Sequence, residues 1–400
     1  MISVKEAEQI LGNSLLSNQL ETVSLDQSVG RVLGEEIIAD RDFPPYNRVT
    51  MDGIAIKGEC YENGQVIYKI EKVVAAGEPQ YSIQNDTSCV EIMTGAVLPY
   101  GLDTVIRYED ITVENGEATV LVDNVKTHQN VHRQGSDRQK SAVIVSPGRV
   151  IGAAEIAIAA TVGKTHLQVQ QLPTIVIVST GDELVPIDQT PEPHQIRTSN
   201  AVMLQAAVRE LGLPVTLRHL SDDLDAVKAG VKELLNSFNV LVFIGGSSKG
   251  RYDYIPETLE ENGVVRHFYK VKQRPGKPFW FGESKGRNQF VFALPGNPVS
   301  CFMCMEKYFK PWLRLSLGVS QNIEIARLKE RIQFNPALTF FAPVRLEYSE
   351  GQYLAIPMTG QGSGDLANLA DADAFMQLPE DQAVFEEGET YPIIKYRPLL

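Results

Sequence analysis

The sequence predicts a multidomain α/β protein: a central doubly wound, mainly parallel α/β domain, an inserted β-rich domain, an α/β N-terminal domain and a small C-terminal β domain. Two observations support this fold class. The chain has 400 residues, whereas single hydrophobic cores stop growing near roughly 250–300 residues. The spacing of apolar residues also changes along the chain, from helical to strand-like and back. We therefore expect four domains, formed by residues 1–40 with 139–172, 41–138, 173–320 and 321–400.

The first part of the chain contains the expected insertion. Residues 1–40 alternate helical and short extended patterns, and a Pro-Pro pair at 44–45 breaks them. From about residue 53 to 138, short β-type segments are separated by Gly, Pro and Asn turns. A helical pattern returns around 152–163. We expect that helix to pack back against residues 1–40, which makes the β-rich domain an insertion.

From Pro173 onward, strands and helices alternate. The apolar segments TIVIVS, NVLVFI and QFVFAL read as buried strands, and helical patterns cover 200–211, 224–235 and 299–317. This alternation predicts a doubly wound, mainly parallel sheet. After about residue 320, short strands and turns predict a small C-terminal β domain.

Composition and charge exclude several classes of protein. The chain carries 37 basic and 50 acidic residues, a formal net charge of −13, so it lacks the broad basic face that nucleic acids require. Its longest apolar runs are shorter than the roughly 20 residues of a membrane span, and its start does not resemble a signal peptide. With only four cysteines, a reducing compartment is favoured. We expect a cytoplasmic protein with neither nucleic acid nor membrane as partner.

Three predicted strand ends carry polar loops that contain glycine, at 179–183, 245–250 and 294–298. In a doubly wound sheet, ligands bind beyond the carboxyl ends of the strands. Glycine lets the backbone approach a ligand, and free N–H groups beside hydroxyls bind anions. The loops match neither the Walker nor the GxGxxG spacing, and glycine for turn geometry alone is the alternative interpretation of each.

Basic residues concentrate in one segment of this acidic chain. Seven Lys or Arg face only four acids between residues 249 and 277, which suits a ligand rich in phosphate or oxyanion. A solvated basic face is the alternative. The seven are Lys249, Arg251, Arg266, Lys270, Lys272, Arg274 and Lys277.

Six acidic residues lie beside the expected loops. Carboxylates that face a bound phosphate require Mg²⁺ between them, because like charges repel. Taken singly, each could equally cap a helix or lie in a solvated turn. Cys301 and Cys304 lack a second ligand pair, so we expect them in the core and not on zinc. The six acids are Asp52, Asp182, Glu183, Asp222, Asp223 and Asp253.

Seven motifs occur in order along nearly the full length. With them, the chain resembles the molybdopterin molybdenumtransferase (MoeA) family, which includes the gephyrin E domain and the plant Cnx E domain. The motifs are PPYNRVTMDG at 44–53, IMTGA at 92–96, RQGSD at 133–137, STGDEL at 179–184, GGSS at 245–248, RPGKP at 274–278 and LPGNPVS at 294–300.

The resemblance implies a reaction and an assembly. Adenylylated molybdopterin and molybdate are the substrates, molybdenum cofactor and AMP are the products, and Mg²⁺ assists. The family resemblance also implies a four-domain homodimer whose clefts combine both subunits, and contact with the adenylyltransferase of the preceding step is a further expected partnership.

The resemblance also assigns roles to residues at matching positions. Ser248, Arg274, Lys277, Arg345 and Ser363 would hold molybdate or phosphate by charge-assisted hydrogen bonds, with Lys270 added to this substrate-binding set. The acids Asp182, Glu183, Asp222 and Asp253 would position Mg²⁺ and the pyrophosphate, with Asp182 and Asp253 as metal ligands. The β-rich domain of the partner subunit would supply Asp52, Thr94 and Asp137. The expected catalytic residues are Asp52, Thr94, Asp137, Glu183, Asp222 and Asp253.

Several positions depart from the family pattern: the run at 47–50, Thr198, Ser247, Lys249 and Arg274. They leave open a catalytically altered paralogue that binds or carries molybdopterin without inserting metal. A nucleotide-binding adenylyltransferase is a third interpretation, since related α/β domains perform the preceding step. Asp52, Asp253 and Lys277 are retained, and they favour catalysis because a carrier would not need them.

Overall fold

A computed structural model describes residues 1–17, 19–245, 254–320, 322–358, 362 and 364–397. The chain forms two compact units. The larger unit comprises residues 1–21, 30–32 and 168–400, and the smaller unit comprises 22–29 and 33–167. This division is coarser than the four domains expected from the sequence, whose boundaries stay a prediction. Among the described residues, no helix combines the length and apolar character needed to cross a membrane.

The smaller unit is built around a six-stranded sheet in the order β7-β4-β6-β5-β9-β8. Ile54 and Ile56 face one hydrophobic cluster and Ala55 faces another, because successive residues of a strand point to opposite faces. The elements are β4 (Gly53–Ile56), α2 (Gly58–Glu62), β5 (Ile67–Val74), β6 (Cys89–Ile92), β7 (Thr104–Arg107), the 3₁₀ turn η2 (Tyr108–Asp110), β8 (Ile111–Glu114) and β9 (Glu117–Val120).

Short strand pairs connect the segments that precede and follow this sheet. β3 pairs with β10, β2 pairs with β11, and β1 pairs with β12. The elements are β1 (Leu20–Ser24), the 3₁₀ turn η1 (Asp26–Ser28), β2 (Ile37–Ile38), β3 (Arg48–Val49), β10 (Val131–His132), β11 (Val143–Val145), α3 (Ala153–Thr161) and β12 (His166–Gln170).

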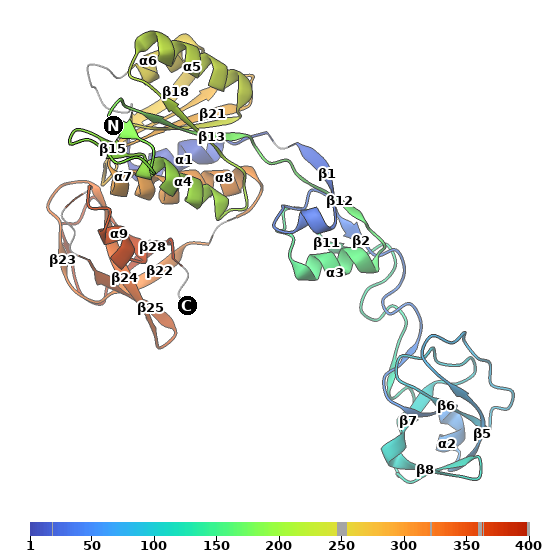
Figure 1. Cartoon of the computed structure of the whole chain (residues 1–400). Helices are drawn as coiled ribbons and strands as arrows, with labels where there is room; N and C mark the ends of the chain where they lie inside the picture. Colours follow the sequence, from blue (N-terminus) through green and yellow to red (C-terminus); the bar gives the residue numbers. More distant parts are fainter. Residues whose placement is uncertain (18, 246–253, 321, 359–361, 363, 398–400) are drawn as a thin grey trace. The chain divides into compact units, whose positions relative to one another are not determined.

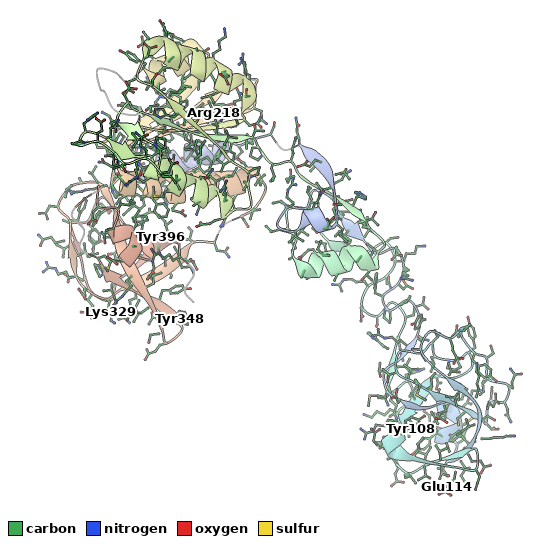
Figure 2. The ribbon with its side chains drawn as sticks, viewed as in Figure 1. Tyr108, Glu114, Arg218, Lys329, Tyr348 and Tyr396 are labelled. Atoms are coloured by element: carbon green, nitrogen blue, oxygen red, sulfur yellow. The ribbon has the colours of Figure 1, made fainter. Side chains whose placement is uncertain are left out.

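The centre of the larger unit is a six-stranded sheet in the order β16-β13-β17-β21-β20-β18. Its first four strands are parallel, and the last two pair antiparallel. Arg218 lies on the edge strand β16 (Figure 2). The strands are β13 (Ile175–Thr180), β16 (Thr216–Leu220), β17 (Val240–Ile244), β18 (Val264–Lys270), β20 (Pro278–Ser284) and β21 (Gln289–Leu294), and the small pair beside them is β14 (Leu184–Val185) with β15 (Ile196–Arg197).

Helices cover both faces of this sheet (Figure 1). α5 and α6 pack on one face, and α1, α4, α7 and α8 pack on the other. The bounds are α1 (Val4–Asn13), α4 (Ser199–Arg209), α5 (Leu224–Ser237), α6 (Ile255–Glu261), α7 (Pro298–Cys304), the π-helical turn η3 (Met305–Phe309) and α8 (Lys310–Ser316). The sequence pattern thus gives the doubly wound architecture that was expected, because buried parallel strands need a helix on each side.

The C-terminal part of the larger unit is a small β-barrel. Its sheet runs β19-β24-β25-β22-β28-β26, and a further pairing of β24 with β26 closes it. The aromatic ring of Tyr396 contacts Phe302 of α7 and Phe375 of the barrel, at centroid distances of 5.0 and 5.4 Å (Figure 2). The bounds are β19 (Gln273–Arg274), β22 (Glu324–Leu328), β23 (Ile332–Gln333), β24 (Thr339–Ser349), β25 (Gln352–Pro357), α9 (Asn368–Asp371), β26 (Ala374–Leu378), β27 (Val384–Phe385) and β28 (Thr390–Lys395).

The predicted fold class is confirmed: the chain is a multidomain α/β protein with a central, mainly parallel sheet, a β-rich N-terminal region and a C-terminal β domain. The long helix expected at 299–317 is present, but it is interrupted by the π-helical turn η3. Cys301 and Cys304 are fully buried in its first segment, as expected.

Candidate functional site

The parallel strands bring the starts of the three expected glycine loops to one edge of the central sheet, and residues 246–250 of the second loop lie outside the described residues. Ser179 of β13 is in register with Ile244 of β17, and Ile244 is in register with Leu294 of β21. The chain therefore leaves all three strands at the same level, and Gly245 N–H donates to the carbonyl of Leu294 at 3.1 Å. The segment after β16 emerges at the same edge, since Thr180 is in register with Leu220. This is where doubly wound proteins bind ligands.

Two of the predicted acids face each other at this edge. The backbone N–H of Asp182 donates to the carboxylate of Asp222 at 3.4 Å, and the N–H of Asp222 donates to Asp182 at 3.3 Å. The carboxylate of Glu183 lies over Gly181 and fills the space that a side chain there would need. Gly181 also has a positive φ. Asp223 has a structural role, because it caps α5 by accepting from the N–H of Ala226.

The Asp182–Asp222 pair fits a magnesium ion that is completed by substrate. Mg²⁺ is typically held by one or two protein carboxylates together with phosphate oxygens and water. Within the described ranges, no cluster of three or more His, Cys, Asp or Glu side chains is arranged to hold a metal by itself. The donor set is therefore of the kind that binds Mg²⁺ with its phosphate ligand.

A cavity of about 520 Å³ opens beside the same edge, and we call it the Arg274 cavity. Its lining includes Pro295 and Asn297 from the loop after β21, Arg274 from the end of β19, and Lys277 from the loop between β19 and β20. The remaining lining is largely apolar. It comprises Gln273, Pro275, Gly276, Pro278, Val299, Ser300, Gln333, Phe334, Leu338, Phe340, Phe341, Pro343, Met358, Gly362 and Asn368.

The two cations of the Arg274 cavity face no carboxylate among the residues that the structure describes. Neither Arg274 nor Lys277 forms an ion pair with any residue that the structure describes, and the described lining contains no Asp or Glu. The guanidinium of Arg274 lies 5.9 Å from the centroid of the Phe334 ring, which orients it by a cation–π contact. Phe334 stacks on Phe340 at 4.3 Å. Two oriented positive charges in an apolar setting suit an anion.

Two predicted substrate-binding residues lie outside the lining of this cavity. The ammonium group of Lys270 lies 5.0 Å from the ring centroid of its neighbour Tyr269. Arg345 is exposed on β24, with its guanidinium 3.6 Å from Glu347. It stands two residues beyond Pro343, which does line the cavity. Three predicted site residues lie outside the described residues: Ser248, Asp253 and Ser363. So do Ser247 and Lys249, two of the departures from the family pattern, and Arg251 of the basic segment.

The smaller unit carries the other three predicted residues. The carboxylate of Asp52 accepts from the N–H of Thr94 at 2.6 Å, and hydrogen bonds from Thr94 lower the pKa of Asp52. The Nε2 atom of His132 lies 2.8 Å from a carboxylate oxygen of Asp137. The other ring nitrogen, Nδ1, lies 3.2 Å from a guanidinium nitrogen of Arg48. Strand β3 connects the Asp52–Thr94 contact with the Asp137–His132 contact. Its residue Val49 pairs with Val131, the neighbour of His132. The carbonyl of Val49 also accepts from the N–H of Gly95, the neighbour of Thr94.

Some residues of the site carry no signal in the sequence. Phe334 reaches Arg274 only because β19 pairs with β24, far along the chain. Asn200 of α4 donates its amide to the carbonyl of Gly296 at 2.7 Å, which fixes the start of the helix to the loop after β21. Thr198, one of the departures from the family pattern, precedes α4 and forms no capping hydrogen bond with its side chain.

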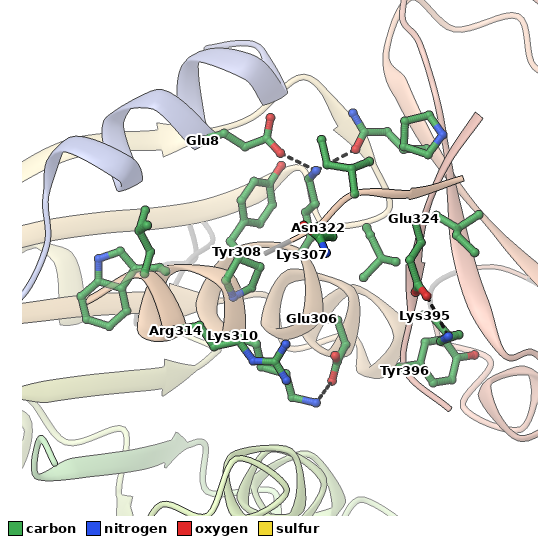
Figure 3. A pocket seen from close by; sticks show the side chains of 18 of the residues that line it. Glu8, Glu306, Lys307, Tyr308, Lys310, Arg314, Asn322, Glu324, Lys395 and Tyr396 are labelled. Carbon is green, nitrogen blue, oxygen red and sulfur yellow. Dashed lines mark hydrogen bonds and ion pairs between the residues drawn. The ribbon is translucent and has the colours of Figure 1, made fainter. Parts of the chain in front are cut away.

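A second cavity, of about 780 Å³, lies among α1, α8, β22 and β28, and we call it the Lys310 cavity (Figure 3). Its lysines are paired with acids. Lys310 contacts Glu306 at 2.6 Å and Glu210 at 2.8 Å, and Lys395 contacts Glu324 at 2.9 Å. Lys307 pairs with Glu8 and also donates to Gln377 at 2.7 Å.

Comparisons with known families match three consecutive parts of the chain. The MoeA N-terminal region (domain I and II) matches residues 2–163. A probable molybdopterin binding domain matches residues 176–315. The MoeA C-terminal region (domain IV) matches residues 325–396.

Full-length relatives agree with these matches. A protein named molybdopterin molybdenumtransferase from a Synechocystis strain is 37% identical over 395 residues, which are 98% of this chain and 99% of that protein. A protein of the same name from Bacillus subtilis is 32% identical over 408 residues, covering 99% of this chain and 94% of that protein. The crystal structure of the molybdopterin biosynthesis moeA protein from Pyrococcus horikoshii covers 100% of both chains, with a TM-score of 0.86 and 29% identity.

Proposed function

Since the chain belongs to the MoeA family, we propose that it catalyses the reaction of a molybdopterin molybdenumtransferase in molybdenum cofactor biosynthesis. Molybdate is inserted into adenylylated molybdopterin, and AMP is released. The observation that carries this proposal is the Arg274 cavity, in which two cations without an acidic partner among the described residues border the carboxyl edge of the sheet. Both substrates are anions.

Arg274 and Lys277 hold an oxyanion in this proposal. Each supplies charge-assisted hydrogen bonds, which are shorter and stronger than neutral ones. The aromatic and aliphatic lining from Leu338, Phe340 and Met358 provides an apolar surface for the flat pterin ring. The cavity is thus charged at one loop and apolar elsewhere, as a ligand with an anionic end and a ring system requires.

Asp182 and Asp222 would hold Mg²⁺ together with the pyrophosphate, and Glu183 stands next to them. The ion would neutralise the charge that develops on the departing AMP. Hydrogen bonds from Thr94 lower the pKa of Asp52 and so favour its ionised form. Asp52, Thr94 and Asp137 would complete the site from the partner subunit, and Ser248, Asp253, Lys270, Arg345 and Ser363 remain proposed members of it.

The proposal includes a cytoplasmic homodimer and contact with the preceding adenylyltransferase. The shared site requires this dimer, because Asp52 and Asp137 of one subunit's smaller unit would complete the Arg274 cavity in the larger unit of its partner. A monomer at micromolar concentration in analytical ultracentrifugation would contradict the shared site.

The decisive experiment measures AMP release from adenylylated molybdopterin with Mg²⁺, with and without molybdate. We expect molybdate-dependent release by the wild type and a loss of at least a hundredfold in Asp222→Asn. Asp225→Asn is the matched control, because it makes the same charge change at an exposed position of α5. Tight binding of substrate without AMP release would contradict the proposal and indicate a carrier.

A further inference from the structure

Gln273 precedes Arg274 and is the buried anchor of the loop that carries both cations. Its side chain is fully buried, at 0% exposure. Its amide Nε2 donates to the carbonyl of Gly276 at 2.8 Å, and its Oε1 accepts from the hydroxyl of Tyr308. Both polar atoms of the amide are therefore used, one on the loop and one on the helix behind it.

The loop is closed around this amide. The N–H of Val271 donates to the carbonyl of Lys277 at 3.1 Å, so the segment between them returns on itself. Gly276 has a φ of +84°. A Cβ there would lie 2.8 Å from the sulfur of Cys304 and 2.9 Å from the Gln273 amide. Only glycine lets the turn lie this close to the anchor.

Tyr308 fixes the anchor from the side of the π-helical turn η3. It is 1% exposed, its ring lies 4.9 Å from that of Phe279, and burial raises the pKa of its hydroxyl. The hydroxyl therefore stays protonated and donates to Gln273. π-Helical turns are rare, and they occur frequently at functional sites.

Packing alone does not require this polar pair. A buried amide and hydroxyl are costly unless they bond to each other, and apolar side chains of similar size would fill the space without that cost. What the amide adds is a directed bond to Gly276 O, which lies between Arg274 and Lys277 in the chain and directly precedes Lys277. A bond of this kind fixes the loop before the ligand arrives and reduces the entropy lost on binding.

We propose that Gln273 and Tyr308 are positioning residues that hold the 274–277 loop in the conformation that grips the molybdate oxyanion. The inference rests on the proposed function, because it assigns a substrate to Arg274 and Lys277. Gln273 acts through the backbone of Gly276, and Tyr308 acts through Gln273. Neither residue touches the reacting atoms.

The test uses Gln273→Met, Tyr308→Phe and the double variant in the full-length protein. We expect the KM for molybdate to rise about tenfold in all three, with kcat within about twofold of the wild type. We also expect Tm to fall in each single variant, where a buried polar atom loses its partner. It should recover in part in the double variant, where the amide and the hydroxyl are both removed and only the Gly276 carbonyl lacks its donor. Tyr68→Phe is the matched control, because it removes another fully buried hydroxyl, which bonds to Gln65 O at 2.9 Å in the smaller unit. Its KM should not change.

A role in packing alone would give a different pattern. KM would then recover together with Tm in the double variant, and this result would overturn the proposal, as would an unchanged KM in Gln273→Met. Amide hydrogen exchange of residues 271–278 is independent of turnover, and it should accelerate in Gln273→Met. If the wild type releases no AMP, the proposed function fails. Unchanged exchange would instead contradict the positioning role.

Discussion

The two cavities of the larger unit differ in whether their lysines are paired with acids. In the Lys310 cavity, Lys307, Lys310 and Lys395 each contact a glutamate (Figure 3). In the Arg274 cavity, Arg274 and Lys277 have no acidic partner within the described residues. The Lys310 cavity is the larger, at about 780 Å³ against about 520 Å³.

The difference teaches that charge balance, and not cavity size, separates a structural site from a binding site here. A cation whose charge is neutralised inside the protein has little to offer a ligand, and its removal leaves a buried acid. Arg274 and Lys277 are exposed, so water solvates their charges when no anion is bound. Their removal should therefore affect binding and leave folding nearly unchanged. Four predictions test this comparison.

The largest expected effect is on stability, in Lys310→Met. The side chains of Lys310 and Glu306 are 10% and 5% exposed, and breaking a buried ion pair by removing one partner costs about 3–5 kcal/mol. Both tryptophans, Trp280 and Trp312, are buried in the larger unit, so urea unfolding followed by tryptophan fluorescence reports on this region. Lys228→Met is the control, because its pair with Glu261 is half exposed and contributes less than about 1 kcal/mol. Equal losses in the two variants would contradict the structural role of Lys310.

The next effect is on activity, in Lys277→Gln. Hydrogen bonds to charged groups contribute about 1.5–3 kcal/mol, so we expect kcat/KM for molybdate to fall by roughly a hundredfold. The unfolding transition should not move. Lys285→Gln, at an exposed turn between β20 and β21, should retain full activity. A large stability loss in Lys277→Gln would place this lysine with the structural cations.

A smaller effect is expected in Arg274→Lys. The charge is kept, but the planar fork and the cation–π contact with Phe334 are lost. We expect the KM for molybdate to rise about tenfold, which corresponds to ~1.4 kcal/mol. Phe334→Leu should change KM in the same direction through loss of the same contact. If Phe334→Leu has no effect, the ring does not orient the guanidinium.

The smallest effect is a pH dependence of stability in Glu306→Gln. Burial raises the pKa of Glu306 above its ordinary value of 4.5, so the folded state binds this proton more tightly than the unfolded state does. The free energy of unfolding therefore decreases as pH rises from 4.5 through the raised pKa. Urea unfolding of the wild type and Glu306→Gln across pH 4.5–8 should show this decrease in the wild type and a flatter profile in the variant. Parallel profiles would show that Lys310 fully compensates the burial.

Local patterns were sufficient for the elements and for part of the site. The strand TIVIVS and the helix after Thr198 were predictable because the apolar period of a segment depends on its own residues. Arg274 and Lys277 were predictable as partners because they share one short loop. The grouping of Asp182 with Asp222 followed from the parallel sheet, since both come directly after its strands.

The basic segment from 249 to 277 shows where this reasoning stops. The sequence analysis treats this segment as one cationic patch, but the fold places its described basic residues in different surroundings. Arg266 pairs with Glu260 at 3.3 Å, and Lys270 lies over Tyr269. Only Arg274 and Lys277 of the described members line the Arg274 cavity. The sequence shows how many charged residues a segment contains, whereas a binding site depends on which of these residues the fold leaves without an ion-pair partner.

The sequence by itself determined the elements, the order of the loops along the sheet edge and the family, because each depends on local pattern or on ordered motifs. Only the tertiary structure decided which residues are buried and which charges are paired. The Glu306–Lys310 spacing is visible in any helical segment, but its burial depends on packing among α1, α4 and the barrel. From the sequence, Gln273 would likewise be expected at the surface beside Arg274. In the structure, its amide is buried and bonds to Tyr308 and Gly276. Burial and pairing arise from contacts between distant segments, and no local pattern encodes them.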